Sequence, residues 1–259
     1  MARRKNTGRT GKPSVREKAY RHIQRLVADG TLEAGAAVSE LVLAKELGSS
    51  RTPIREAMNQ LAAEGLLEVS PNGGMVVSQL KREDIIELYE LREALEVYAV
   101  GKVARVPLRP ADKDRLQYMV DLIATVEREV EQRATRELDS EQMTRFIAAD
   151  LGFHALLMSM SNNSRIQKLI NDTRLLIRIF AIQRRGHTAE ELRSIRDYHQ
   201  KILDAVANHD SALAMQMLAE HIQISQRERL NQYDDWRREF RLQQDISTMF
   251  NVGSMEPVL

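Results

Sequence analysis

Residues 49–79 read SSRTPIREAMNQLAAEGLLEVSPNGGMVVSQ, and the hydrophobic period changes once within this stretch. From Thr52 the apolar residues recur at helical spacing, and Gly65 is placed to end that helix. The segments LLEVS and MVVSQ that follow have the alternation of strands, and the PNGG between them is typical of a tight turn that needs positive φ angles. The stretch therefore predicts a helix followed by a β-hairpin.

Two further helical segments precede this stretch, one at residues 14–28 and one at residues 39–47. Ser39 stands where it can cap the second segment, and residues 32–38 between the two are expected to form a loop. A tight turn that contains glycine joins the second segment to the helix of the opening stretch. The order helix, helix, helix, hairpin predicts a winged helix-turn-helix over residues 13–80.

Positive charge is concentrated at the start of the chain. Residues 1–25 contain nine Lys and Arg against one acidic residue, whereas the whole chain has a formal net charge of +1. Residues 1–12 have no apolar periodicity and are expected to form a disordered basic arm. A basic front end on a winged helix favours a nucleic acid as the partner.

The helix of the opening stretch carries residue types that read a DNA sequence. Arg51 and Arg55 are four residues apart and share one face, opposite an apolar stripe that would face the core. Arginine pairs bidentately with guanine, while Ser50, Thr52 and the backbone amides at the helix start can hold phosphates. The alternative is that the two arginines merely solvate an exposed face. Agreement among the turn, the wing and the basic first helix favours DNA reading.

Helical patterns occupy most of the chain from residue 81 onward, and no further strand pattern appears. We therefore expect a mainly α protein, in which the winged helix-turn-helix is followed by an all-α antiparallel bundle of six to seven helices. The bundle is assigned to residues 81–240, with the final helix ending near Phe240 and residues 241–259 forming a tail. The segments are expected at about 83–105, 111–136, 140–160, 163–185, 189–208 and 211–240.

The amino-acid composition limits both the cellular compartment of the protein and the kinds of site it can contain. The chain has no cysteine, which excludes disulfides and thiolate metal sites. No apolar run approaches the roughly 18 residues that span a bilayer, and the start of the chain lacks the apolar core of a signal peptide. We therefore expect a cytoplasmic protein with no membrane partner.

Four polar side chains interrupt the apolar stripes of the helical region. Asp150 and His154 are four residues apart within one stripe, and His199 and His221 lie within the stripes of two later segments. A carboxylate on an apolar face is costly unless it is paired or coordinated. One Asp with three His suits Zn²⁺, Ni²⁺, Mn²⁺ or a similar divalent ion. The alternative is a hydrogen-bonded core of Asp and His without a metal.

The run SRTPIREAMNQLAAEGLLE at residues 50–68 resembles the recognition helix of the GntR family of transcription regulators, and PNGGMVV at 71–77 resembles its wing. The helical remainder, which includes LYELREALEVYAV at 88–100, resembles the FadR-type ligand domain called FCD. Many relatives carry a basic residue at the positions of Leu41 and Gly73, so this chain is expected to read DNA with fewer side-chain contacts, or with its amino-terminal arm.

The resemblance also implies a role for individual residues. Arg51 and Arg55 would contact bases or phosphates with support from Thr52, and the wing would enter the minor groove through Asn72, Gly73 and Gly74. A divalent metal, zinc in the first place with nickel or manganese as alternatives, would be held by Asp150, His154, His199 and His221. Effectors of this family are often small organic acids. Their countercharge would come from Arg92, Arg174 and Arg178, unless these arginines form ordinary salt bridges.

These observations lead to one functional hypothesis and two alternatives. We expect a ligand-responsive transcriptional regulator, a repressor or an activator, that binds a near-palindromic DNA operator as a homodimer and senses a small organic acid through a metal. A metal-dependent helical hydrolase would use the same Asp and His residues, but no obvious general base stands beside them, so an enzyme is not expected. The other alternative is a DNA-binding protein without an effector.

Overall fold

The structure is a computed structural model that describes residues 13–28, 30–71, 73–79, 81–133, 138–181 and 187–251. The predicted arm at residues 1–12 lies outside these residues, as does Asn72 of the predicted wing. The chain divides into two compact units, one of residues 1–79 with 178–182 and the other of residues 80–177 with 183–259. Each unit is described by itself.

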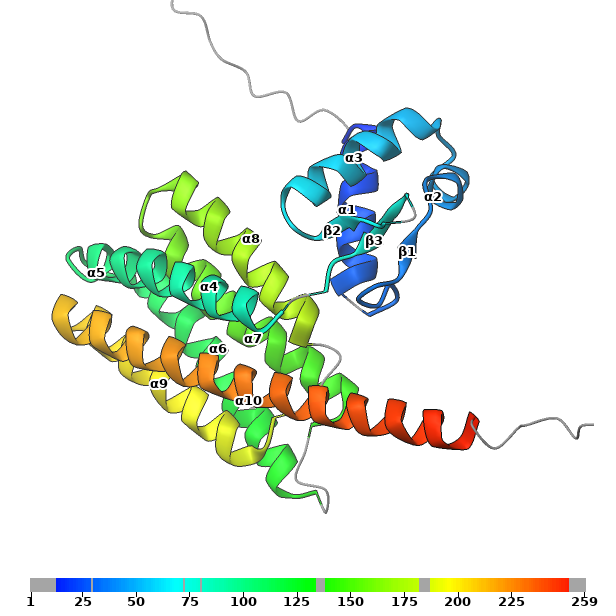
Figure 1. Ribbon diagram of the computed structural model, residues 1–259. Helices are drawn as coiled ribbons and strands as arrows, with labels where there is room; N and C mark the ends of the chain where they lie inside the picture. The colour runs from blue at the N-terminus through cyan, green and yellow to red at the C-terminus, as the bar shows by residue number, and fades with distance from the viewer. Residues whose placement is uncertain are drawn as a thin grey trace, which may run out of the picture. The chain divides into compact units, whose positions relative to one another are not determined.

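The first unit is a winged helix (Figure 1). Its helices α1 and α2 both pack on α3, and its three strands form an antiparallel sheet in the order β1-β3-β2. The hairpin of β2 and β3 matches the prediction, whereas β1 arises in a segment expected to be a loop. The elements are α1 (Val15–Ala28), β1 (Ala37–Val38), α2 (Glu40–Glu46), α3 (Arg51–Ala63), β2 (Leu67–Val69) and β3 (Met75–Val77).

Turn chemistry sets the boundaries of these elements. The Ser39 side chain caps α2 by accepting a hydrogen bond from the backbone N–H of Val42 at 3.4 Å, as predicted. Gly73 and Gly74 have φ angles of 81° and 83°, which a residue with a side chain rarely adopts, so the wing turn requires glycine there. Ser50 is the N-cap of α3 but makes no side-chain capping bond. The Ser50 hydroxyl is therefore not committed to the helix end.

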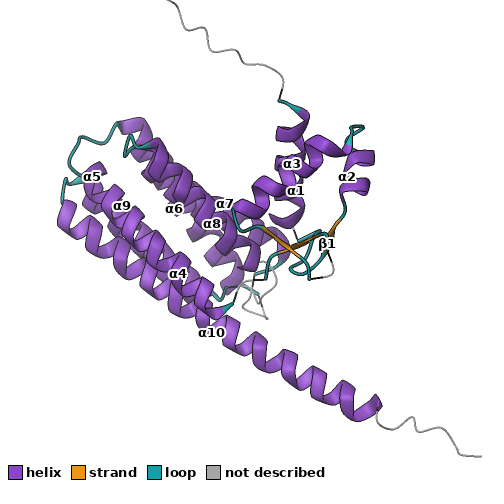
Figure 2. Cartoon of the chain, turned by 45° about the horizontal axis from the view of Figure 1, so that its top comes forward, coloured by secondary structure: helices purple, strands orange, loops and turns teal. Residues whose placement is uncertain are grey.

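The described residues of the second unit form helices joined by turns and loops (Figure 2). When α4, the π turn η1 and α5 are taken as one continuous helix, the described part of this unit has six helices, as the periodicity predicted. The bounds are α4 (Arg82–Arg92), η1 (Glu93–Val97), α5 (Tyr98–Val103), α6 (Pro110–Glu131), α7 (Ser140–Ser159), α8 (Ser164–Ala181), α9 (Ala189–Ala207) and α10 (Ser211–Asn251).

The final helix is longer than predicted. It was expected to end near Phe240, but α10 continues to Asn251. Residues 241–251, RLQQDISTMFN, contain neither glycine nor proline, and the first glycine of the tail stands at position 253. Because nothing in this segment breaks a helix, the backbone hydrogen bonding continues through it.

Helix α6 packs against α7 and α9, and α10 packs against α9, α4, η1 and α5. Helices α5 and α10 approach closely at Gly101, where a Cβ would lie 2.5 Å from Sδ of Met215 and would require that side chain to move. At α9, the predicted capping box is present, since Thr188 and Glu191 each accept a hydrogen bond from the other's backbone N–H. The capping box thus sets the start of α9 where the sequence predicted it.

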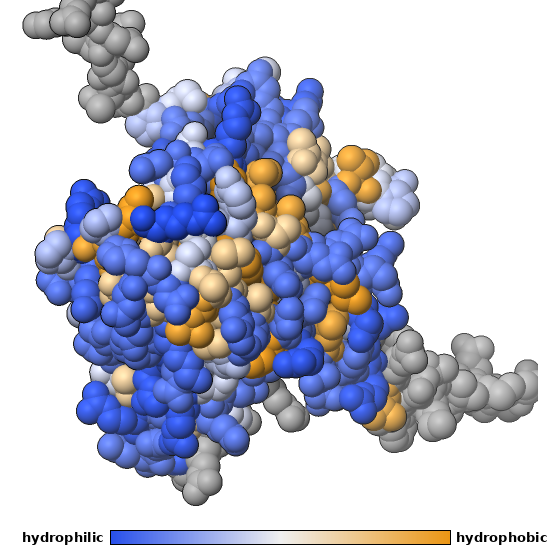
Figure 3. All heavy atoms as spheres, turned by 90° about the vertical axis from the view of Figure 1, so that its left-hand side faces the viewer, coloured by the Kyte–Doolittle hydropathy of each residue, from blue (hydrophilic) through white to orange (hydrophobic). Residues whose placement is uncertain are grey.

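Most of the face drawn in Figure 3 is hydrophilic, with hydrophobic residues in separate patches. Scattered apolar exposure of this kind is normal for a protein surface. Among the described residues, no helix is both long enough and apolar enough to cross a membrane.

Two leucines of the first unit provide a test of its packing. Leu61 on α3 is completely buried, while Leu41 on α2 is 67% exposed. Leu61→Ala should destabilise the winged helix by about 2–5 kcal/mol because it leaves a cavity, and Leu41→Ala should change stability by less than about 0.5 kcal/mol. Hydrogen exchange of α1 and α3 amides in the full chain measures both. Equal protection in the two variants would contradict this packing.

Candidate functional site

Helix α3 presents the predicted DNA-reading residues to solvent. Arg51 and Arg55 have side chains that are 60% and 57% exposed, and Ser50 and Thr52 are also exposed. The opposite face of α3 is buried through Ile54, Ala57, Met58 and Leu61. In the wing, Gly73 and Gly74 are exposed and Asn72 lies outside the described residues. The fold therefore leaves the described members of the predicted set accessible.

A residue that sequence reasoning missed holds both arginines. Glu40, at the start of α2, accepts hydrogen bonds from Nε and Nη2 of Arg55 at 2.8 and 2.9 Å and from Nη2 of Arg51 at 3.1 Å. The hydrogen bond from Arg55 is the main cause that lowers the pKa of Glu40. The pairing was not visible in the sequence, because it joins two helices across the turn. Its effect is to orient the two guanidinium groups before any ligand is present.

Asp150, His154, His199 and His221 meet inside the helical unit. Each offers one ligand atom, and these four atoms all lie within 4.8 Å of one another. Asp150 and His154 come from α7, His199 from α9 and His221 from α10. His154 and His199 are completely buried, His221 is nearly so, and the Asp150 side chain is 25% exposed. The fold thus brings together all four residues that the sequence singled out.

The spacing of these atoms fits a shared cation. Nε2 of His154 lies 3.1 Å from Nε2 of His199, and Oδ1 of Asp150 lies 3.9 and 3.5 Å from these two nitrogens. Ligand atoms roughly 2.0–2.2 Å from one ion are about 3–4 Å apart. Among the described residues, the other ring nitrogens, Nδ1 of His154 and Nδ1 of His199, form no hydrogen bond. Two facing imidazole nitrogens beside a carboxylate are therefore a set of donors that a divalent ion fits.

Protonation in this cluster favours cation binding. Burial lowers the pKa of His154 and, more strongly, the pKa values of His199 and His221, so their rings are neutral at neutral pH. Burial alone would raise the pKa of Asp150, but the neighbouring His154 and Arg174 outweigh it and the pKa is lowered. The cluster therefore presents nitrogen lone pairs and one negative charge.

The predicted countercharges Arg92 and Arg174 are both paired within the protein. Glu96, which is completely buried, accepts hydrogen bonds from Nε of Arg92 at 2.9 Å and from Nε and Nη2 of Arg174 at 2.9 and 2.7 Å. This is the salt-bridge alternative considered for these arginines. Arg174 still borders the cluster, because its Nη1 lies 3.7 Å from Oδ2 of Asp150. The side chain of Arg178 lies outside the described residues.

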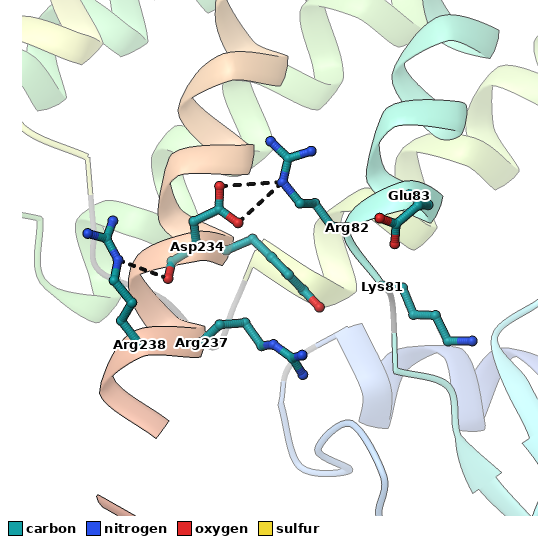
Figure 4. A pocket seen from close by; sticks show the side chains of 7 residues that line it. Lys81, Arg82, Glu83, Asp234, Arg237 and Arg238 are labelled. Atoms are coloured by element: carbon teal, nitrogen blue, oxygen red, sulfur yellow. Dashed lines mark hydrogen bonds and ion pairs between the residues drawn. The ribbon is translucent and has the colours of Figure 1, made fainter. Parts of the chain in front are cut away.

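A separate pocket of about 730 Å³ lies between the start of α4 and α10 (Figure 4). Its walls are mostly charged, and an ion pair between Arg82 and Asp234 at 3.3 Å crosses it. None of the residues predicted to bind DNA, metal or effector lines it. The lining residues are Lys81, Arg82, Glu83, Tyr233, Asp234, Arg237 and Arg238.

The buried imidazoles make the stability of the metal-free protein depend on pH. Because the pKa values of His154, His199 and His221 are lower in the folded chain, their contribution is present above the ordinary value near 6.5 and is lost as pH falls below it. Urea unfolding with a chelator should give a lower stability at pH 5.5 than at pH 7.5. His221→Gln should reduce that difference. Equal stability of the unmodified chain at the two pH values would contradict the burial of neutral imidazoles.

Comparison with known proteins assigns both units to families. Residues 15–77 match the family described as "Bacterial regulatory proteins, gntR family". Residues 87–224, more than half of the chain, match the family described as "FCD domain". The second match contains Asp150, His154, His199 and His221, and the first contains the exposed arginines of α3.

Individual relatives agree with this assignment. The chain is 31% identical over 196 residues to the probable D-xylose utilization operon transcriptional repressor of Paenarthrobacter nicotinovorans. This alignment covers 76% of this chain and 80% of that protein. It is 26% identical over 204 residues to the gluconate operon transcriptional repressor of Bacillus subtilis (strain 168), covering 77% and 78%. The solved structure of E. coli McbR/YncC, 22% identical, has the same fold with a TM-score of 0.69, covering 85% of this chain and 99% of that one. The chain therefore belongs to the GntR family, as a DNA-binding transcriptional regulator with an FCD domain and not an enzyme.

Proposed function

We propose that this chain is a cytoplasmic repressor that binds a near-palindromic DNA operator as a homodimer and senses a small carboxylate through a bound zinc ion. The observation that carries the sensing part is the convergence of Asp150, His154, His199 and His221 in the helical unit. We assign DNA binding to residues 13–80, and ligand sensing and dimerisation to residues 81–240. The names of two relatives, both operon repressors, support repression as the mode of action.

DNA reading is assigned to α3 and the wing. Arg51 and Arg55 would reach base edges in the major groove, and Ser50, Thr52 and the amides at the start of α3 would hold phosphates. The turn of Asn72, Gly73 and Gly74 would enter the minor groove. Exposure of the described members of this set supports the assignment. Since each chain has one such helix, two copies are needed to read two half-sites about one DNA turn apart.

The metal would be held by Nε2 of His154 and His199, by His221 and by the Asp150 carboxylate. Three nitrogens and one carboxylate oxygen form a ligand set that zinc accepts, with nickel and manganese as competing occupants. The ion would supply a positive centre that attracts a carboxylate ligand. Glu96 pairs with both Arg92 and Arg174 and offsets one of their two positive charges, so we assign the attraction of an effector mainly to the metal.

The DNA assignment is tested on a duplex that the wild-type chain selects from a randomised pool. Arg51→Ala and Arg55→Ala should each weaken binding to that duplex by about 5- to 150-fold, the loss expected for one bidentate contact with guanine. Arg128→Ala on α6 makes the same charge change on the helical unit and should leave the affinity within about twofold. Failure to select any duplex, or equal losses in all three variants, would overturn the assignment.

The metal assignment is tested by elemental analysis after zinc loading and dialysis. The wild-type chain should retain stoichiometric zinc, whereas Asp150→Ala combined with His199→Ala should retain none, because half of the donors are gone. Asp172→Ala combined with His22→Ala removes the same residue types outside the cluster and should retain the metal. Retention by the first double variant would show that the site is wrongly placed, and a different metal from a native preparation would correct its identity.

Sensing is tested by titrating mono-, di- and tricarboxylic acids into the complex with the selected duplex. At least one acid should change the affinity for DNA by about 5- to 150-fold with zinc present, and the change should vanish with chelator or in the Asp150, His199 double variant. If no acid changes the affinity, the chain is an effector-independent DNA-binding protein. An effect that survives the chelator would place the effector away from the metal.

A further inference from the structure

Glu96 lies at the border of the candidate metal site, although it is not one of the four donors. It belongs to the π turn η1 between α4 and α5, and within that turn it is the buried residue. π turns are rare and occur frequently at functional sites. Its completely buried carboxylate lies within ion-pair distance of Arg92, His154 and Arg174. The sequence pattern had not linked Glu96 to these three residues.

Two of these partners hold Glu96 in place. Arg92 and Arg174 together donate three hydrogen bonds to its two oxygens at 2.7 to 2.9 Å. Arg92 is itself restrained, because its guanidinium carbon lies 4.9 Å from the centre of the Tyr89 ring. Bonds from two directions leave the carboxylate little rotational freedom, so the position of each oxygen is set before any ligand binds.

The third partner is a metal donor. Nδ1 of His154 lies 3.1 Å from Oε2 of Glu96, within ion-pair distance, although the two groups are not aligned as a hydrogen bond in this structure. Nε2, on the other side of the same ring, faces Nε2 of His199 and Oδ1 of Asp150. A carboxylate beside Nδ1 favours the tautomer with the proton on that nitrogen, and this tautomer leaves a lone pair on Nε2.

We propose that Glu96 is the positioning residue of the metal site: it accepts a hydrogen bond from Nδ1–H of His154 and so directs the Nε2 lone pair toward Asp150 and His199. The inference rests on the proposed metal function. Glu96 does not touch the ion; it fixes the tautomer and the ring orientation of one donor, while Arg92 and Arg174 fix Glu96. The ring position is therefore linked to α4 and α8 as well as to α7.

A matched control separates this role from a merely structural one. Glu127 is also buried and also paired with two arginines, since its oxygens lie 2.9 Å from Nε of Arg193 and 2.8 Å from Nη1 of Arg196. Among the described residues, the ion-pair partners of Glu127 are arginines and include no histidine. Glu127→Gln therefore alters a buried carboxylate that pairs with two arginines, which are more exposed than Arg92 and Arg174, without removing a partner from a candidate metal donor.

The test measures zinc affinity by chelator competition in the full chain. Glu96→Ala and the isosteric Glu96→Gln should weaken zinc binding by about 10- to 100-fold, the usual effect of removing a partner of a ligating histidine, with the smaller loss in Glu96→Gln. Glu127→Gln should lower thermal stability but leave zinc affinity within about twofold. The proposal is overturned if both Glu96 variants keep the wild-type affinity, or if Glu127→Gln loses as much as Glu96→Gln.

A second readout does not need the metal. Long-range ¹H–¹⁵N correlation spectra of metal-free protein labelled at histidine report which ring nitrogen carries the proton. In the wild-type chain His154 should be protonated on Nδ1, and in Glu96→Gln and Glu96→Ala the proton should move toward Nε2. A wild-type His154 protonated on Nε2 would overturn the role of Glu96. If the chain bound no zinc while this tautomer shift was present, the metal function would fail and the positioning role would stand.

Discussion

The negative charge of Glu96 has to be satisfied inside the helical unit, and three helices meet around it for that purpose. Arg92 from α4, Arg174 from α8 and His154 from α7 all face this carboxylate. Burial alone would raise the pKa of Glu96, but Arg174 and Arg92 hold it well below its ordinary value, so the group stays charged. Losing one partner of a buried pair typically costs about 3–5 kcal/mol, so this network strongly restricts how the helices can pack.

The same network sets the electrostatics of the candidate metal site. The negative charge of Glu96 partly offsets the positive charge of the two arginines near the imidazoles. Asp150 is the one carboxylate among the four candidate ligands. Nε2 of His154 and Nε2 of His199 face each other at 3.1 Å, and neutral rings with both protons on Nδ1 would leave two lone pairs opposed there. A divalent ion would satisfy them, and the positive centre it adds would be the feature that a carboxylate effector could recognise.

The winged helix uses the same pairing of one carboxylate with two arginines in the opposite environment. Glu40 holds Arg51 and Arg55, but both guanidinium groups are more than half exposed. Exposed ion pairs contribute little to stability, so the proposed exchange of Glu40 for phosphates or base edges would cost little free energy. The ion pairs of Glu40 are thus open to solvent, whereas those of Glu96 are enclosed in the helical unit.

Local patterns in the sequence predicted most helices, the hairpin and the four residues of the candidate metal site. Period and capping chemistry predicted the winged helix and the six bundle helices, and polar residues on apolar stripes identified Asp150, His154, His199 and His221, because a helix places its side chains at a known spacing. The tertiary structure alone decided the partners of the arginines. Arg174 meets Glu96 across 78 positions of the chain, and Arg55 meets Glu40 across 15, so both pairings depend on how separate helices pack and not on any local spacing. For the same reason the two-residue strand β1 was not predicted, since it forms only by backbone pairing with β3.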